Sequence, residues 1–117
     1  MDNFLTIDKG DIIIEVVNLV KATNEQAEEF KLILLKHIDD GNIKLIVDLH
    51  QCVFVDTTFL STLLIALKAA IKKGGNLKLA SPKHDVAEVL EATGMNRVFD
   101  IYESIPDAIS SFYTSKD

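Results

Sequence analysis

The sequence predicts a single α/β domain with a mixed, mostly parallel β-sheet, an N-terminal β-hairpin and about four helices. Two observations predict this class. Short β-branched segments alternate with segments whose apolar residues recur at helical spacing, and only a few residues connect them. With 117 residues, of which 48% are hydrophobic, the chain is long enough to bury one core. We therefore expect one domain over residues 1–117, with a frayed tail from about residue 114.

The first elements are a hairpin and a helix. Residues 4–7 and 12–17 are two apolar, β-branched runs around a glycine-containing turn, which predicts paired strands. Thr23 precedes Gln26 by three residues, the spacing of a capping box, and apolar residues then recur at helical period until Gly41. The first helix is therefore expected to start at Thr23.

The central strand and the second helix follow. Residues 43–49 are short, β-branched and apolar on both faces, as in a strand buried in a helix-covered sheet. The second helix ends at Gly74-Gly75, and a further strand is expected over residues 77–80. The expected inward face of this helix consists of large apolar residues: Leu60, Leu63, Leu64, Leu67 and Ile71.

Two more helices and a short strand complete the expected order. Ser81 and Pro82 read as the N-cap and first residue of a third helix that stops at Gly94. A strand is expected over residues 98–101. Ser104 then opens the last helix, with a proline in its first turn.

Charge and composition exclude several classes of function. Twelve Lys and Arg against eighteen Asp and Glu give a net charge of -6, so nucleic acid and anionic membranes are poor partners. The longest apolar stretch, residues 59–67, is far shorter than the about 20 residues that span a bilayer. The chain shows no signal-peptide pattern, and its one cysteine cannot form an internal disulfide, so we expect a cytoplasmic protein.

Asp48, His50 and Cys52 alternate along an extended segment, the arrangement that a metal site or a Cys-His pair would use. A third ligand has no obvious source, because His37 and His84 lie on other helices. A single cysteine is commonly a small buried residue. We therefore expect no metal, no cofactor and no catalytic residue.

Asp56 could pair with Asp48 as two catalytic carboxylates, but helix capping is the simpler role for it.

The loop over residues 50–58 follows the central strand, where parallel sheets commonly place their ligand sites. Thr57 and Thr58 bring two hydroxyls to the start of the second helix. A phosphate on Thr58 would be stabilised by the helix N-terminus and would repel an acidic partner surface. The expected outward stripe of this helix resembles a docking surface, since its residues are small or apolar: Thr58, Thr62, Ile65 and Ala69.

Several short segments carry a shared pattern over nearly the whole chain. They are Ile46-Val47-Asp48-Leu49, Val55-Asp56-Thr57-Thr58-Phe59-Leu60, Lys73-Gly74-Gly75-Asn76-Leu77, Val89-Leu90-Glu91-Ala92-Thr93-Gly94-Met95, and Val98-Phe99-Asp100-Ile101-Tyr102 leading to Asp107-Ala108. This pattern resembles the STAS domain family, which bacterial anti-sigma factor antagonists share with the tails of sulfate transporters. In the second segment the family has Asp-Ser-Ser-Gly-Leu-Gly.

The resemblance implies a non-enzymatic switch that binds an anti-sigma factor, often itself a serine-protein kinase, and so releases a sigma factor. In the family the second hydroxyl residue receives the phosphate from the kinase, which maps onto Thr58 and less well onto Thr57. A separate PP2C-type phosphatase removes it. Here Thr replaces Ser twice, while Phe59 and Ser61 replace the two glycines. Phe59 is either a core edge or a partner anchor, and we count it, with Asp56, among the expected partner-binding residues.

A second function stays open on the same resemblance. The chain could be a constitutive STAS scaffold subunit of a stress-signalling assembly or of a lipid-transport ABC complex, without phosphorylation. The bulk of Phe59 favours this alternative, whereas the length of 117 residues favours an antagonist over a transporter tail. The sequence leaves the oligomeric state, nucleotide binding and the identity of the partner open.

Overall fold

A five-stranded sheet organises the computed structural model, which describes residues 2–114. Its strand order is β1-β2-β4-β6-β7, with β1 and β2 antiparallel and the remaining pairs parallel. The strands are β1 (Phe4–Lys9), β2 (Ile12–Val17), β4 (Lys44–Asp48), β6 (Asn76–Ala80) and β7 (Ile101–Tyr102). This arrangement confirms the predicted mixed, mostly parallel sheet and its N-terminal hairpin.

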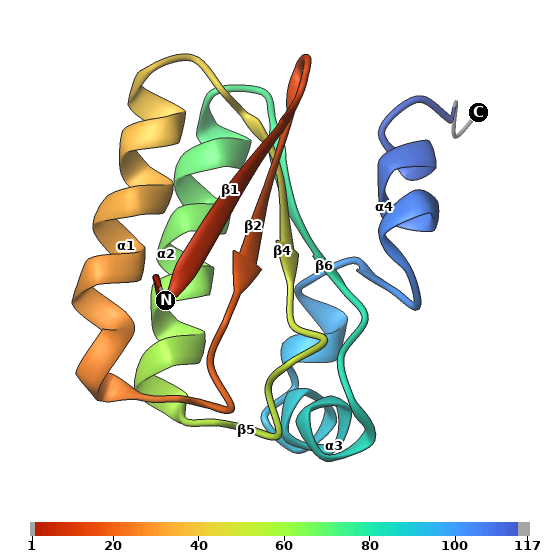
Figure 1. Cartoon of the computed structure of the whole chain (residues 1–117). Coiled ribbons are helices and arrows are strands. Elements are labelled where there is room, and N and C mark those ends of the chain that lie inside the picture. Colours follow the sequence, from red (N-terminus) through yellow and green to blue (C-terminus); the bar gives the residue numbers. More distant parts are fainter. Residues whose placement is uncertain (1, 115–117) are drawn as a thin grey trace.

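The helices cover both faces of this sheet (Figure 1). Helices α1 (Asn24–Asp39) and α2 (Thr57–Lys72) lie side by side on one face, whereas α4 (Ile105–Ser111) lies on the other. Helix α3 (His84–Ala92) and a 3₁₀ turn (Met95–Arg97) pack at the end of the sheet where α2 begins. The observed helices confirm the predicted fold class.

A second, two-stranded sheet joins the starts of α1 and α2. Strand β3 (Lys21–Ala22) pairs in parallel with β5 (Phe54–Val55). The pattern in the sequence does not reveal these strands, because each has two residues and their pairing joins distant segments. Through this pair, the residue before each helix is held at the same end of the molecule.

Three phenylalanines stack through the core between the hairpin, α1 and α2. The ring centroids of Phe4 and Phe30 are 4.3 Å apart, and those of Phe30 and Phe59 are 5.3 Å apart with nearly parallel planes. Phe59 is 0% exposed. It is therefore a core residue, and its placement on the expected partner-binding surface is corrected.

Thr62 is also misplaced by the helical wheel. Its side chain is 5% exposed, and its Oγ1 donates to the carbonyl of Ala27 in α1 at 3.3 Å. Helix α2 packs against the sheet and also against its neighbour α1, so it buries a wider arc than one apolar face. The expected outward position of Thr62 is wrong for this reason, and Ile71, expected inside, is 56% exposed.

Two boundaries near the C-terminus differ from expectation. Helix α3 begins at His84, because Ser81 has a left-handed φ of 59° and its amide donates to the carbonyl of Tyr102 at 2.8 Å. The strand expected over residues 98–101 is displaced to β7, because the 3₁₀ turn uses residues after Gly94. The last helix starts after Ser104 as predicted. The expected frayed tail lies, from residue 115 onward, outside the described residues.

None of the helices within residues 2–114 is both long and apolar enough to cross a membrane.

The stacked position of Phe59 predicts its contribution to stability. Phe59→Ala should lower the free energy of unfolding by about 3–5 kcal/mol, because it removes a buried ring that Phe30 and the core surround. Urea denaturation followed by circular dichroism measures this change. The matched control Ile65→Ala, on the exposed face of the same helix, should change stability by only about 0.5 kcal/mol. Equal effects of the two substitutions would contradict the assignment.

Candidate functional site

The candidate site lies at the end of the molecule where β4 finishes and α1 and α2 begin (Figure 1). The loop over residues 49–56 leads from β4 through β5 into α2. Functional side chains commonly gather at this carboxyl end of parallel strands. The fold therefore brings the loop after β4, where the sequence analysis expects a functional site, next to α3 and the start of α1.

Asp56 organises this end of the molecule. Its Oδ1 accepts the amide of Phe59 at 2.8 Å, which caps α2 as expected. Its Oδ2 accepts the amide of Asn24, the first residue of α1, also at 2.8 Å. Its own amide donates to the carbonyl of Ala22 in β3 at 3.0 Å. Both oxygens of the carboxylate thus accept hydrogen bonds from backbone amides. The bond to Asn24 joins segments that are far apart in the sequence, so a local capping pattern does not indicate it.

Thr57 and Thr58 follow the cap as the first two residues of α2, and both are exposed. Their backbone carbonyls accept the hydroxyls of Ser61 at 2.9 Å and Thr62 at 3.4 Å. The first turn of a helix presents amide groups and the positive end of the helix dipole, which favour a negative group. A hydroxyl at this place is therefore both accessible to modification and well placed to carry a phosphate.

The structure brings Asp48 and His50 together but buries Cys52. His50 Nδ1 lies 2.9 Å from Asp48 Oδ2, and the His50 amide donates to Asp48 Oδ1 at 3.0 Å. Cys52 is 0% exposed, and its burial, with a smaller effect of the Asp48 charge, raises the pKa of the thiol to about 11. A buried thiol that keeps its proton is a poor nucleophile and a poor ligand.

A pocket of about 170 Å³ lies beside the first turns of α2. Two of the hydroxyls that line it donate hydrogen bonds to backbone carbonyls. Ser61 donates to the carbonyl of Thr57, and Thr93 donates to the carbonyl of Val89 at 2.8 Å. The space is therefore mainly apolar. The sequence does not reveal it, because α2 and the end of α3 form it together. Its lining residues are Thr57, Leu60, Ser61, Leu64, Thr93 and Met95.

A cluster of exposed apolar side chains belongs to the short β3–β5 sheet and the segments leading into it. Val20 is 61% exposed, Val53 43% and Phe54 45%. The carbonyl of Val20 accepts the amides of Val53 at 2.8 Å and Phe54 at 3.2 Å, which holds the three residues together. We call Val20, Val53 and Phe54 the apolar patch. Adjoining exposed apolar residues of this kind are typical of interaction surfaces.

The expected docking stripe on α2 loses one of its four residues, because Thr62 is buried. Thr58 and Ile65 are exposed, Ile65 by 46%, and Ala69 is half-buried. Together with Asp56 and Thr57, these residues remain at the surface where the sequence placed them.

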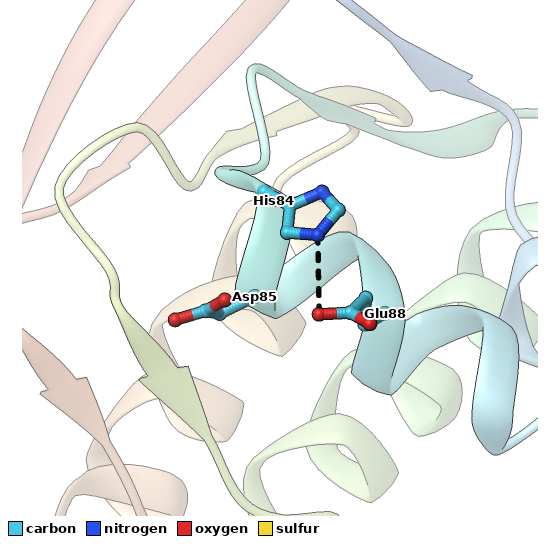
Figure 2. A group of neighbouring side chains, drawn as sticks. All are labelled: His84, Asp85 and Glu88. Carbon is cyan, nitrogen blue, oxygen red and sulfur yellow. Dashed lines mark ion pairs between the residues drawn. The ribbon is translucent and has the colours of Figure 1, made fainter.

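Figure 2 shows a group that the sequence analysis did not single out, at the start of α3. His84, Asp85 and Glu88 are all exposed, and their ligand atoms lie within 4.8 Å of one another. His84 Nε2 lies 3.3 Å from Glu88 Oε1, as the dashed line marks. Exposed groups of this kind are common on helices without an ion, and we assign no metal to it.

Comparison with known families identifies the chain. The STAS domain model matches residues 6–108, so the chain belongs to the STAS domain family. Its relatives by sequence and structure include anti-sigma factor antagonists.

Three of these relatives show the extent of the similarity. The chain is 28% identical to the "Putative anti-sigma factor antagonist BtrV" of Bordetella bronchiseptica, over 95% of this chain and 96% of the relative. A crystal structure described in the same terms, TM1081 of Thermotoga maritima, is similar with a TM-score of 0.86, at 26% identity and covering 95% of both chains. Unphosphorylated SpoIIAA, an anti-sigma factor antagonist, shares the fold with a TM-score of 0.83 at 13% identity, covering 97% of this chain and 99% of its own. Phosphorylated SpoIIAA of Bacillus gives a TM-score of 0.73 at 14% identity, covering 93% and 98%.

The burial of Cys52 predicts slow reaction with iodoacetamide. At pH 8 a thiol with a pKa of about 11 is ionised in only about one molecule in a thousand, and its rate should rise as the pH approaches 11. Mass spectrometry of the alkylated protein measures this rate. The same protein unfolded in guanidinium is the control and should react at least about a hundredfold faster at pH 8. Equal rates in the two states would show that the thiol is accessible and ionisable.

Proposed function

We propose that this chain is an anti-sigma factor antagonist that binds an anti-sigma factor and is released from it when Thr58 is phosphorylated. The chain acts as one STAS domain and as a binding protein, with no cofactor and no catalytic group of its own. The observation that carries the proposal is the placement of Thr58, an exposed hydroxyl in the first turn of α2, two residues after the N-cap residue Asp56. The family relationship supports the class of partner.

The proposed docking surface is centred on the start of α2. Its residues are Asp56, Thr57, Thr58, Ile65 and Ala69. The pocket beside Thr57 adds a recess of about 170 Å³, close to the size of cavities that bind one benzene molecule, so it suits one apolar side chain of the partner. The surface therefore combines exposed hydroxyls, one large exposed aliphatic group and an apolar recess, as binding sites commonly do.

Phosphorylation would change this surface by charge and by size. The kinase transfers the γ-phosphoryl group of ATP to Thr58 Oγ1: the bond to ADP breaks, the new O–P bond forms and the hydroxyl proton is lost. The phosphate adds about -1.5 to -2 charges in the middle of the docking surface. A partner group that packs against the neutral hydroxyl must then desolvate an anion, which disfavours binding.

The remaining components of the proposal are those that the resemblance to anti-sigma factor antagonists implies. The anti-sigma factor is itself the serine-protein kinase and supplies ATP and magnesium, and a PP2C-type phosphatase restores the hydroxyl. Transcription is controlled in the cytoplasm, where the chain would act. SpoIIAA, which shares the fold, occurs in unphosphorylated and phosphorylated forms, which supports a modification on this scaffold.

The alternative of a constitutive scaffold loses the observation that favoured it. That observation was the bulk of Phe59 at a position where a partner would approach. The ring of Phe59 is buried against Phe30, so it leaves the surface around Thr58 unobstructed. The scaffold function is therefore kept as the alternative that a negative result for the switch would favour.

Binding to partners from a lysate of the source cells tests the switch. Wild type and Thr58→Ala should retain an anti-sigma factor or serine kinase, identified by mass spectrometry, while Thr58→Glu should retain at least tenfold less, because it adds a negative charge at the docking surface. Circular dichroism of the three proteins controls for folding. Equal retention by all three would contradict the switch and favour the scaffold.

The docking surface itself is tested at Ile65. Ile65→Glu should weaken binding to the retained partner by at least about tenfold, because it places a charge where an apolar side chain packs. Isothermal titration with the purified partner measures the affinity. Leu32→Glu is the matched control, since Leu32 is 58% exposed on α1, and it should leave the affinity unchanged. A loss of affinity in Leu32→Glu alone would move the docking surface to α1.

A further inference from the structure

The two oxygens of Asp56 hold the starts of two different helices. Oδ1 accepts from Phe59 in α2 and Oδ2 accepts from Asn24 in α1, both at 2.8 Å. The two helices therefore share one carboxylate as a cap, although Thr23 also caps α1 through its side-chain bond with the amide of Glu25 at 3.2 Å. Any force that moves this carboxylate acts on both helices.

We propose that phosphorylation of Thr58 displaces the Asp56 carboxylate from the start of α1, so that the modification also changes the conformation of the segment over residues 20–24. This inference rests on the proposed function only in naming phosphorylation as the trigger. Asp56 is a positioning residue in this account. Through it, the charge at Thr58 changes the structure of a segment that the phosphate does not touch.

Charge and competition for donors give the physical reason. Thr58 lies two residues after Asp56 and directly before Phe59, whose amide Asp56 occupies. A phosphate with about -1.5 to -2 charges at this turn repels the carboxylate and is a stronger acceptor for the same amide. The two carboxylate oxygens move as one rigid group. Displacement of the carboxylate from the amide of Phe59 therefore also breaks its hydrogen bond with the amide of Asn24.

The segment that would respond carries part of the apolar patch. The carbonyl of Ala22 accepts the amide of Asp56 at 3.0 Å, and the carbonyl of Val20 accepts the amides of Val53 and Phe54. A shift of Asp56 loosens this pairing between β3 and β5. The phosphate would then act on the molecule in two ways, by its own charge and by altering the shape of the apolar patch.

The chain offers a variant that separates the two bonds of Asp56. In Asp56→Asn the side chain keeps one acceptor oxygen and gains an NH₂ group that cannot accept a bond. Asn is as good an N-cap as Asp, so this variant should still cap α2 and remain folded. It should lose the second bond, to Asn24, and with it the proposed coupling to Thr58.

Amide hydrogen exchange followed by NMR on the isolated protein measures the coupling. The amide of Asn24 should exchange about tenfold faster in Thr58→Glu than in wild type, because it loses a bond to a charged acceptor. A protein with phosphothreonine incorporated at position 58 should show the same change or a larger one. In the Asp56→Asn background, Thr58→Glu should leave the exchange of Asn24 unchanged. Ile65→Glu, which adds the same charge further along α2, is the control and should have no effect at Asn24.

The outcomes distinguish this inference from the proposed function. Unchanged exchange at Asn24 with both Glu and phosphothreonine at position 58 would overturn the coupling, as would an equal acceleration in the Asp56→Asn background. Neither result requires the partner, so binding of the anti-sigma factor and its loss on Thr58→Glu are judged separately. An acceleration that depends on Asp56 would support the coupling even if the chain were a constitutive scaffold subunit.

Discussion

The carboxylate of Asp56 is the interaction on which the candidate site depends. Two helices begin at this end of the molecule, and each start leaves backbone amides without partners inside its own helix. One side chain satisfies an amide from each, and its own backbone bonds to β3. The first turn of α2 is therefore fixed relative to α1, which places Thr57 and Thr58 outward on a defined surface.

The stack of Phe4, Phe30 and Phe59 supports the same turn from inside the core. Phe59 directly follows Thr58, so burial of its ring sets the direction in which the preceding hydroxyl faces. A rigid inner residue beside an exposed modifiable one lets a phosphate be added without disturbing the core. The replacement of the family glycine by Phe59 is thus compatible with an open surface, because the extra volume lies inside the molecule.

Much of the fold could be predicted because its signals are local. The hairpin turn, the capping box of Thr23 with Gln26, and the start of the last helix at Ser104 each depend on residues within a few positions of one another. The residues at 55–60 that carry the resemblance also lie, as expected, at the start of α2, where Asp56 caps the helix. These features need no knowledge of which distant segments meet.

The features that the sequence did not reveal all depend on distant contacts. Thr62 is buried because α1 packs beside α2, and the second bond of Asp56 reaches Asn24 across the β3–β5 pair. The pocket likewise needs the end of α3 next to α2. Ser81 was misread as a helix cap because its bond to Tyr102, and not its residue type, sets its backbone conformation.

The central claim is that Thr58 is the residue through which a kinase controls this chain. The most direct test incubates the purified kinase partner with magnesium and ATP and with wild type, Thr57→Ala or Thr58→Ala, and counts phosphates by intact-protein mass spectrometry. The account predicts one phosphate on wild type and on Thr57→Ala, mapped to Thr58 by fragmentation, and none on Thr58→Ala. A phosphate on Thr58→Ala, or an unmodified wild type in the presence of an active kinase, would contradict it.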